Sequence, residues 1–545
     1  MKQEKDWYKE LVIYQIYPRS FKDGNGDGIG DLKGMTEKLD YLKELGITAV
    51  WMSPVYASPN VDNGYDISDY RQIMEESGTM EDWERFRDKA HERGIAVIMD
   101  LVLNHSSDLH PWFQESKKSK DNPYSDYYIW RDPAPDGGAP NQWLSVFGGS
   151  AWEYVEERGQ YYLHFFAKQQ PDLNWDNEEA REKIFDIIRF WNDKGVDGYR
   201  VDAISYLDKG LDGRADMTEA FGTASCANLE GTHRYIREMV QKTIKPDNLM
   251  TVGEVIIRNT RDARDYTGRS REEFDMAIPF VPPVVEIRTW SPERFKKDLE
   301  ETYECLKEDG WWARFLSNHD KPRQVSLYGD DRRYWKESAK MLGCYLHTLP
   351  GTPFVYQGEE LGMTNLYLPS IEEYDDIDTK NYYYTMIREG ASHEKALSES
   401  QIISRDNART PMQWDGSANA GFSEARPWLP VNPNYTKINA ERQMEEEDSV
   451  FRFYQKLIAL RKENPVMVHG DFRLCCDREG PVIAYTRSLG RETWLAVHNF
   501  SGEKVRFDHE KLTGHGEVVI SNYEEPETEQ GSVTLRPYET LVVRV

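Results

Sequence analysis

The sequence predicts an α/β protein: a (β/α)8 TIM barrel with a subdomain inserted after its third strand and an all-β sandwich domain at the C-terminal end. Three observations predict this fold. Eight apolar, strand-like runs alternate with amphipathic helical patterns, as expected of a parallel barrel. Two of the connections between these elements are far too long to be plain loops. After about residue 468 the pattern changes to short strands separated by turn residues.

The eight predicted barrel strands are short apolar runs of the kind that is buried on both faces of a parallel sheet. Helical patterns lie between them, with apolar residues recurring every three or four positions in segments 32–45, 295–306, 335–349 and 450–460. The predicted strands are Val12–Pro18, Ala49–Pro54, Ile95–Leu103, Gly198–Ala203, Leu249–Glu254, Phe274–Phe280, Arg314–Ser317 and Pro353–Gln357.

Two insertions interrupt the predicted barrel. The first, residues 105–175, is rich in Pro, Gly, Trp and Tyr and predicts a subdomain over the barrel mouth. The second, about 362–447, follows the eighth strand and predicts a functional lid. We therefore divide the chain into a first part of the barrel at 1–104, the inserted subdomain at 105–175, a second part of the barrel at 176–467 and a C-terminal β domain at 468–545.

Composition excludes several classes of function. The chain has 545 residues, of which 95 are acidic and 68 basic, giving a formal net charge of −27. Nucleic-acid binding needs a basic surface, so this charge argues against it and favours a neutral or cationic ligand. Five cysteines without disulfide-framework spacing predict reduced thiols in a cytoplasmic protein. We expect no signal peptide, no membrane association, and a monomer or weak homo-oligomer.

Polar side chains stand at the ends of four predicted strands, where an ordinary core strand would be apolar. In a barrel the carboxyl ends of all strands converge on one face, so these side chains should share one pocket. Arg200 and Asp202 lie two positions apart and leave their strand on the same side; for this pair alone, a structural salt bridge is the alternative. The four strand ends contribute Asp202, Glu254, Asp320, His105, His319 and Arg200.

Paired carboxylates without a metal cluster are typical of glycoside hydrolysis, in which one carboxylate attacks the anomeric carbon and the other protonates the leaving oxygen. Asp202, beside Arg200, is expected to be ionised and suits the nucleophile. Glu254 has no basic neighbour within three residues, so a raised pKa and the acid/base role are expected for it. Asp320 is expected to bind substrate hydroxyls and to favour distortion of the sugar ring.

These strand ends resemble known motifs. Asp100–His105, Gly198–Asp202, Gly253-Glu254 and Asn318–Asp320 resemble the four signature regions of the α-amylase superfamily of retaining glycoside hydrolases (family 13). Gln170–Trp175 resembles the fifth region, in the form found in the oligo-1,6-glucosidase and α-glucosidase branch. The resemblance covers nearly the whole chain.

The resemblance implies a role for each residue. Asp202 would be the nucleophile, Glu254 the acid/base and Asp320 the transition-state stabiliser. In this branch the matches of Asp62 and Arg409 close the pocket beyond the non-reducing sugar, which implies exo cleavage. The residues that match the binding site of the terminal glucose are Asp62, Tyr65, His105, Arg200, His319 and Arg409, and Phe166 is a further candidate for the pocket lining.

An Asp/Gly-rich loop follows the first predicted strand. It has oxygen ligands at every second position and resembles the first nine positions of an EF-hand loop, although Gly34 stands where the bidentate glutamate would be. A metal-free turn is the alternative. The branch has a calcium site in this loop, which implies a structural Ca²⁺, with Mg²⁺ as the alternative ion; no organic cofactor is expected. The implied ligands are Asp23, Asn25, Asp27, the Ile29 carbonyl and Asp31.

Ala203 follows the expected nucleophile and bears on linkage. Relatives selective for α-(1→6) bonds typically have Val at this position, whereas enzymes that accept α-(1→4) bonds tend to have Ala or Thr. A smaller side chain leaves room for the leaving sugar and shifts preference by about 1–3 kcal/mol. The sequence thus predicts a retaining, exo-acting α-glucosidase that acts on short oligosaccharides of the maltose or isomaltose type, and on sucrose, through a covalent glucosyl-Asp202 intermediate.

Several alternatives stay open. One is an oligo-1,6-glucosidase. Sucrose isomerases share the motifs, but segment 321–331 lacks the doubly Arg/Asp-rich signature associated with them. A non-catalytic sugar-binding relative would be expected to lack one of the three carboxylates. A trehalose-6-phosphate hydrolase would need a basic cluster beside the leaving sugar; the candidates alternate with acidic residues, which favours a solvated surface, and they are Arg261, Arg264, Arg269 and Arg271.

Overall fold

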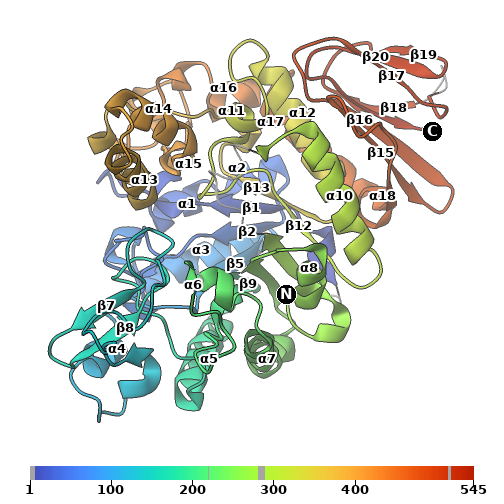
Figure 1. The fold of residues 1–545 in the computed structure, drawn as a ribbon. Coiled ribbons are helices and arrows are strands. Elements are labelled where there is room, and N and C mark those ends of the chain that lie inside the picture. Colours follow the sequence, from blue (N-terminus) through green and yellow to red (C-terminus); the bar gives the residue numbers. More distant parts are fainter. Residues whose placement is uncertain (1–5, 219, 280–288, 513–516) are drawn as a thin grey trace.

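The computed structural model describes residues 6–218, 220–279, 289–512 and 517–545. At its centre, eight parallel strands form a nearly closed barrel in the spatial order β11, β10, β9, β5, β2, β1, β13, β12 (Figure 1). This confirms the predicted barrel; each strand overlaps its predicted run, and Phe280 lies outside the described residues. The strands are β1 (Ile13–Ile16), β2 (Ala49–Met52), β5 (Ala96–Val102), β9 (Gly198–Asp202), β10 (Met250–Val255), β11 (Met276–Pro279), β12 (Ala313–Arg314) and β13 (Thr352–Tyr356).

The barrel strands are apolar because both of their faces are covered. Every residue of β1, β2, β5, β9, β10 and β13 is buried. Successive side chains point to opposite faces. Ile13 packs inside the barrel with Trp51 and Ile98, whereas Tyr14 belongs to the core between the strands and the surrounding helices.

Helices surround the barrel, and several of them begin after a side-chain cap. Thr79 and Asp82 form a reciprocal capping box at α3, and Ser291 caps α10, as its Ser-Pro start predicts. The pattern over 32–45 forms two helices, because the backbone leaves helical geometry at Lys38. The barrel helices are α1 (Leu32–Glu37), α2 (Leu39–Leu45), α3 (Met80–Glu92), α5 (Glu178–Asp193), α6 (Gly222–Cys226), α7 (Glu230–Met239), α8 (Thr260–Thr267), α10 (Pro292–Leu306), α11 (Gln324–Tyr328), α12 (Trp335–Thr348), α17 (Val450–Glu463) and α18 (Pro465–His469).

Two insertions lie on the same side of the barrel in Figure 1. The inserted subdomain contains α4 (Pro111–Ser116) and an antiparallel sheet of β6 (Trp130–Arg131), β8 (Gln160–Leu163) and β7 (Trp152–Val155). A small hairpin, β3 (Tyr56–Ala57) with β4 (Asp69–Ile73), precedes it. The second insertion contains α13 (Ile377–Arg388), α14 (His393–Ile403), α15 (Asp406–Arg409) and α16 (Ala440–Glu445).

The C-terminal domain is all-β and antiparallel, as predicted. One sheet has the order β14, β15, β16, β21, β18 and the other β17, β20, β19. Three of its strands, β14, β19 and β20, were not predicted. The strands are β14 (Asp471–Leu474), β15 (Val482–Leu489), β16 (Glu492–Asn499), β17 (Val505–Asp508), β18 (Glu517–Ser521), β19 (Glu527–Glu529), β20 (Ser532–Leu535) and β21 (Thr540–Arg544).

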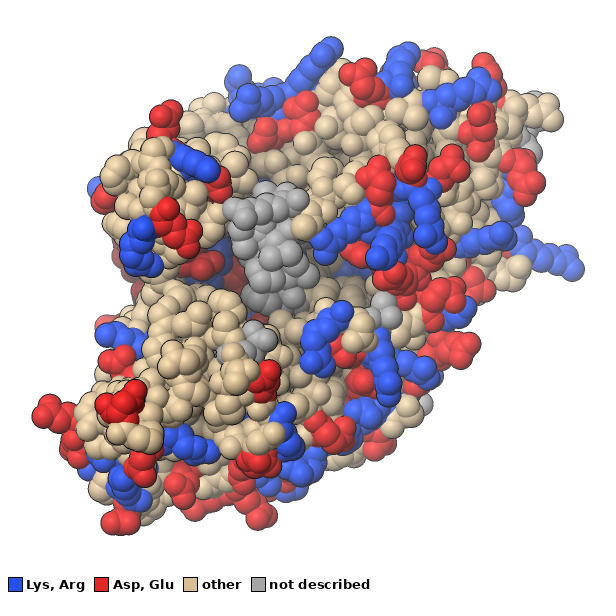
Figure 2. All heavy atoms as spheres, in the orientation of Figure 1, with Lys and Arg blue, Asp and Glu red and all other residues tan. Residues whose placement is uncertain are grey.

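The surface carries both signs of charge. Acidic and basic side chains are interspersed over the face drawn in Figure 2. None of the helices within the described ranges combines the length and apolar character that a membrane span requires. Cys226, Cys344, Cys475 and Cys476 are free thiols.

Candidate active site

The expected nucleophile and acid stand at the ends of adjacent strands. Val252 of β10 pairs with Arg200 of β9, which brings Glu254 beside Asp202. Arg200 is only 1% exposed. Its Nη1 lies 2.7 Å from Asp202 Oδ1 and 2.9 Å from Asp100 Oδ1, and its Nη2 lies 2.7 Å from Glu254 Oε1. One guanidinium therefore holds three carboxylates.

This arrangement corrects two expectations about charge. Burial raises the pKa of Asp202 well above its usual range; Arg200 lowers it, but Glu254 and Asp100 raise it further. Asp202 therefore shares Arg200 with two other carboxyl groups. Its expected ionisation assumed that Arg200 compensates Asp202 alone. Glu254 has no basic neighbour within three residues, but the register of β9 and β10 places Arg200 against it, so it is not remote from a cation. Neighbours in sequence did not reveal a neighbour across the sheet.

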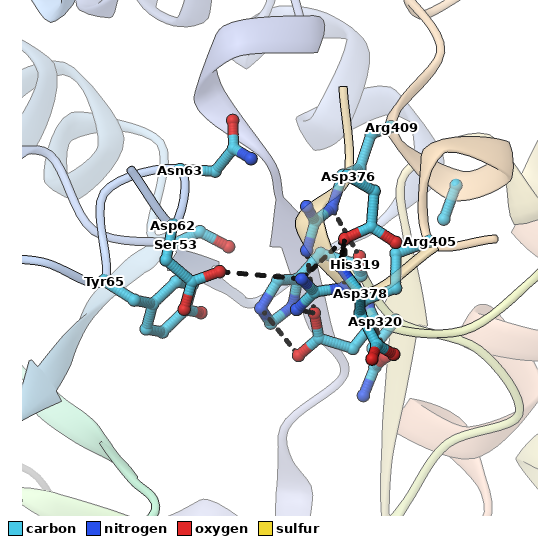
Figure 3. Close-up of polar contacts among 12 residues, drawn as sticks. Ser53, Asp62, Asn63, Tyr65, His319, Asp320, Asp376, Asp378, Arg405 and Arg409 are labelled. Atoms are coloured by element: carbon cyan, nitrogen blue, oxygen red, sulfur yellow. Dashed lines mark hydrogen bonds and ion pairs between the residues drawn. The ribbon is translucent and has the colours of Figure 1, made fainter. Parts of the chain in front are cut away.

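Asp320 follows β12 and faces two arginines from the second insertion. Its Oδ1 lies 2.9 Å from Arg409 Nη2 and 3.3 Å from Arg405 Nη1, and its Oδ2 lies 3.2 Å from His319 Nε2. Figure 3 shows these side chains close together. Burial opposes ionisation of Asp320, but His319, Arg405 and Arg409 outweigh it and lower its pKa below the usual range. Asp320 is thus an ionised carboxylate at neutral pH.

His319 is fixed on both sides. Gln15 Nε2 donates to its Nδ1 at 2.7 Å, and the Tyr65 ring stacks on it at 5.2 Å with an interplanar angle of 7°. Burial lowers the pKa of His319 to about 3, so the ring is neutral. The Tyr65 hydroxyl donates to Asp100 at 3.0 Å, which ties this ring pair to the carboxylates around Arg200.

The opposite wall joins the barrel to the inserted subdomain. Gln170, in the predicted fifth motif but not singled out, donates from Nε2 to Asp62 Oδ2 at 3.1 Å and lies 3.1 Å from His105 Nε2. The Phe166 ring lies 5.1 Å from that of His105. Burial raises the pKa of Asp62 to about 6 and lowers that of His105 to about 4. The contacts thus link all ten predicted catalytic and substrate-binding residues into one site.

Sequence reasoning missed Arg405 and Asp376. Arg405 Nη2 lies 2.6 Å from Asp376 Oδ1 and 3.6 Å from Asp62 Oδ1, in addition to its contact with Asp320. Its guanidinium also lies 5.4 Å from the Phe147 ring of the inserted subdomain. One signal was available: Arg405 precedes Arg409 by four residues at the start of α15, so the two share a helix face.

The predicted metal loop is held by its own hydrogen bonds. Asp23 Oδ2 accepts from the Ser423 hydroxyl at 2.5 Å, and Asp31 caps α1. Asn25 and Asp27 are exposed and each accepts the N–H two residues further on. Within the described ranges, no three His, Cys, Asp or Glu side chains converge as metal ligands. This arrangement does not present a converged ligand set, so we derive no step through a metal and the calcium site stays a prediction.

Comparison with known proteins identifies the family. The model described as "Alpha amylase, catalytic domain" matches residues 15–470, which span the barrel and both insertions. The chain belongs to the α-amylase family of glycoside hydrolases. A second model, for the C-terminal domain of the α-amylase SusG, matches residues 482–542.

Relatives of this α-amylase-family protein cover its full length. It is 48% identical to the oligo-1,6-glucosidase of Parageobacillus thermoglucosidasius over 99% of each chain. Among solved structures, the trehalose-6-phosphate hydrolase of Bacillus licheniformis superposes with a TM-score of 0.94 at 42% identity, over 99% of each chain. The isomaltulose synthase of Protaminobacter rubrum superposes with a TM-score of 0.94 at 41% identity, over 99% of this chain and 100% of the other.

Proposed function

We propose that this protein is a retaining, exo-acting α-glucosidase that releases terminal glucose from short oligosaccharides through a covalent glucosyl-Asp202 intermediate. The observation that carries the proposal is the Arg200 guanidinium, which contacts Asp202 and Glu254 at neighbouring strand ends. Retaining glycosidases need two carboxyl groups close together, one as nucleophile and one as acid/base. Membership of the α-amylase family supports the same chemistry.

In the first step the ionised form of Asp202, whose charge Arg200 balances, attacks the anomeric carbon and Glu254 protonates the glycosidic oxygen. Oδ1 of Asp202 accepts from Arg200, which leaves Oδ2 for the attack. Oε2 of Glu254 accepts from the Ala203 N–H at 3.1 Å, and Oε1 contacts Arg200. To protonate the glycosidic oxygen, one Glu254 oxygen must leave its donor and direct its O–H toward the substrate. Oε2 is suited to this, because the Arg200 side chain that contacts Oε1 is buried.

In the second step water hydrolyses the glucosyl ester, and Glu254 removes the proton of that water. Positive charge develops on the sugar ring in both transition states. Asp320 is suited to stabilise it, because the neighbouring arginines and His319 lower its pKa and keep it ionised. Two displacements at one carbon return the glucose with the α configuration.

The position of Arg405 supports exo cleavage. Arg405 lies between Asp62 and Asp320 and is held by Asp376, while Phe147 of the inserted subdomain covers its guanidinium. These contacts join the barrel, the inserted subdomain and the second insertion. We assign this wall to the closed end of the pocket, which admits one terminal glucose.

Two linkages are candidates, and different observations favour them. Ala203 favours α-(1→4) substrates, because a small side chain beside Glu254 leaves room for the leaving sugar. Its φ of 44° lies in the left-handed region, which a β-branched residue adopts only with strain. The oligo-1,6-glucosidase relatives favour α-(1→6) substrates instead. We propose an enzyme that hydrolyses both, with α-(1→4) preferred.

The contacts of the arginine run weigh against a phosphorylated substrate. Arg261 is exposed and lies near Asp265, Arg269 pairs with Asp6, and Arg271 lies 3.3 Å from Glu273. Arginines paired in this way are poor candidates for a phosphate site beside the leaving sugar. The free thiols support the cytoplasmic location that we propose.

Initial rates of glucose release from maltose, isomaltose, sucrose and trehalose 6-phosphate at equal concentration test this function. We expect maltose or sucrose to lead, with slower release from isomaltose. Isomaltose leading would assign the protein to the oligo-1,6-glucosidases and overturn the argument from Ala203. Binding of maltose without release of glucose from any of the four would contradict the enzyme assignment.

A further inference from the structure

Two glutamates lie buried behind the site, directly after β13. Glu359 and Glu360 begin a short 3₁₀ turn (Glu359–Leu361), and their exposed fractions are 2% and 0%. Neither has a role in the mechanism above. Burying an ionised carboxylate is costly unless cations or hydrogen-bond donors compensate it, so each requires an explanation.

Glu360 has a full set of donors. Its Oε1 accepts from the hydroxyls of Tyr14 at 2.8 Å and Tyr41 at 2.6 Å, and its Oε2 accepts from the Gly358 N–H at 2.9 Å. Glu359 does not. Its Oε1 accepts from the Ser317 hydroxyl at 2.5 Å, whereas its Oε2 is buried without a hydrogen-bond partner among the described residues.

Among the described residues, no charged side chain forms a hydrogen bond or ion pair with Glu359, although the Arg323 guanidinium is near enough to interact with it electrostatically. Glu360 adds a carboxyl on the same turn, with Tyr14 and Tyr41 bound to it. Tyr454 of α17 donates no hydrogen bond to either glutamate and accepts one from Gln324. Arg323 donates to the backbone carbonyls of Gln357, Asn407 and Ala408, and no ion pair joins it to Glu359. Burial raises the pKa of Glu359 to about 8. The Ser317 hydroxyl lowers it, Glu360 raises it further, and the backbone of Tyr356 and Ser317 lowers it.

Ser317 connects this carboxyl to the site. It lies three residues before Asp320, in the segment that also carries His319. The Asp320 N–H donates to Asn318 Oδ1 at 2.8 Å, so a turn begins directly after Ser317, whose hydroxyl is bound to Glu359. A negative charge formed at Glu359 would therefore affect the position of this segment through the Ser317 contact.

We propose that Glu359 is a positioning residue: it keeps a proton at neutral pH and, through Ser317, holds Asp320 in its working place. This inference rests on the proposed role of Asp320 in glucoside hydrolysis. A neutral carboxyl satisfies the Ser317 contact without a buried charge. Loss of the Glu359 proton in alkaline solution destabilises the turn and misplaces Asp320. Glu359 itself does not contact the substrate.

The variant Glu359→Gln tests the proton directly, because an amide mimics a neutral carboxyl. The first readout is the unfolding temperature from pH 5 to 9.5, which needs no activity. Since the folded protein holds this proton more tightly than the unfolded chain, the wild type loses stability relative to the variant as pH rises from about 4.3 to 8. We expect equal unfolding temperatures near pH 5 and a higher value for the variant at pH 8.5. A difference that does not change with pH would overturn the proposal.

The second readout is the pH profile of kcat/KM for glucose release. Only the wild type can lose the Glu359 proton, so its kcat/KM should fall more steeply above pH 8, by one proton, than that of Glu359→Gln. The variant should keep kcat/KM at pH 6.5 within about threefold. Equal slopes of the two proteins on the alkaline side, or a folded variant that has lost activity at pH 6.5, would contradict the proposal.

Two further variants keep the test decisive. Glu360→Gln is the matched comparison: its amide would face an N–H and two hydroxyl donors, so we expect it to unfold at a lower temperature than Glu359→Gln at pH 7. Ser317→Ala breaks the link and should lower kcat at least about tenfold with a smaller change in KM. This variant should also lack the contribution of the Glu359 proton to the alkaline side of the kcat/KM profile. A Glu359→Gln protein that does not fold, or a Ser317→Ala protein with the wild-type profile, would refute the positioning role.

Discussion

Two regions of the protein compensate their buried arginines differently. In the pocket, Arg200 faces three carboxylates and Arg405 faces Asp376, Asp62 and Asp320. Around the junction of the barrel with the C-terminal domain, Arg461 donates to the carbonyls of Lys9 and Gly351, and Arg487 donates to those of Thr348, Val468 and Gly470.

This difference separates function from scaffold. Carbonyl groups accept from these guanidinium groups without adding groups that titrate, although Nε and Nη1 of Arg461 are buried without a partner among the described residues. Burial lowers the pKa of Arg461 to about 9 and that of Arg487 to about 10. Carboxylates instead raise the pKa of Arg200 and Arg405 well above the usual range, despite burial. The arginines of the pocket therefore contact carboxyl groups, which can exchange protons. The arginines of the junction contact backbone carbonyls, which cannot.

Replacing the proposed nucleophile, Asp202, should have the largest effect. Asp202→Asn should lower kcat/KM by about 10⁴-fold or more, because no covalent intermediate can form. Its unfolding temperature at pH 8 should equal or exceed that of the wild type. Burial raises the pKa of Asp202, so the ionised group weakens the folded state as pH rises, and the amide removes this loss. Calorimetry and glucose assays measure both quantities.

The matched control for this variant is a substitution of Asp197, the residue directly before β9. Asp197 accepts from the Val97 N–H at 2.8 Å and contacts His91 at the opposite end of β9. Asp197→Asn should unfold at a lower temperature while keeping kcat/KM within about threefold. If Asp197→Asn inactivated the folded enzyme, or Asp202→Asn remained active, the separation of the two barrel ends would be wrong.

Replacing a pocket cation should follow in size. Arg405→Met removes the partner of three carboxylates and should lower kcat/KM about 100-fold, since the substrate pocket loses its wall and Asp320 loses a contact. Arg405→Lys keeps the charge but not the forked geometry and should recover only part of this loss. Steady-state kinetics on the preferred substrate provide the measurement; wild-type kinetics in either variant would refute the role of Arg405.

Replacing a junction cation should affect stability alone. Arg461→Met leaves the carbonyls of Lys9 and Gly351 without a donor and should cost about 1–3 kcal/mol, which lowers the unfolding temperature by a few degrees. Its kcat/KM should stay within about twofold. A large loss of activity at temperatures where the variant is folded would erase the distinction between the two kinds of buried cation.

Metal removal should have the smallest effect. If the loop of Asp23, Asn25, Asp27, Ile29 and Asp31 binds Ca²⁺, a chelator should lower the unfolding temperature by a few degrees and added Ca²⁺ should restore it. The activity per folded molecule should not change. Asp27→Ala, at an exposed loop position, should abolish the response. Equal unfolding temperatures with chelator and with millimolar Ca²⁺ would refute the predicted site.

The sequence was informative where burial imposes a pattern. Apolar runs located all eight barrel strands, and charged residues at strand ends located Asp202, Glu254 and Asp320. Contacts that depend on register or on distant segments were not accessible: Arg200 reaches Glu254 across the sheet, and Arg405 meets Asp62 across more than 300 residues. Strand β19 was missed because all three of its residues are exposed, so no alternating pattern marks it.

Trapping of the intermediate tests the central claim most directly. A fluorinated α-glucosyl fluoride, which slows hydrolysis of the glucosyl ester, should label the enzyme, and peptide mass spectrometry should find one added fluoroglucosyl group. The account predicts that this group is on the peptide containing Asp202 and is absent from Asp202→Asn. Label on another carboxylate, or an active enzyme that never accumulates a labelled peptide, would contradict a retaining mechanism through Asp202.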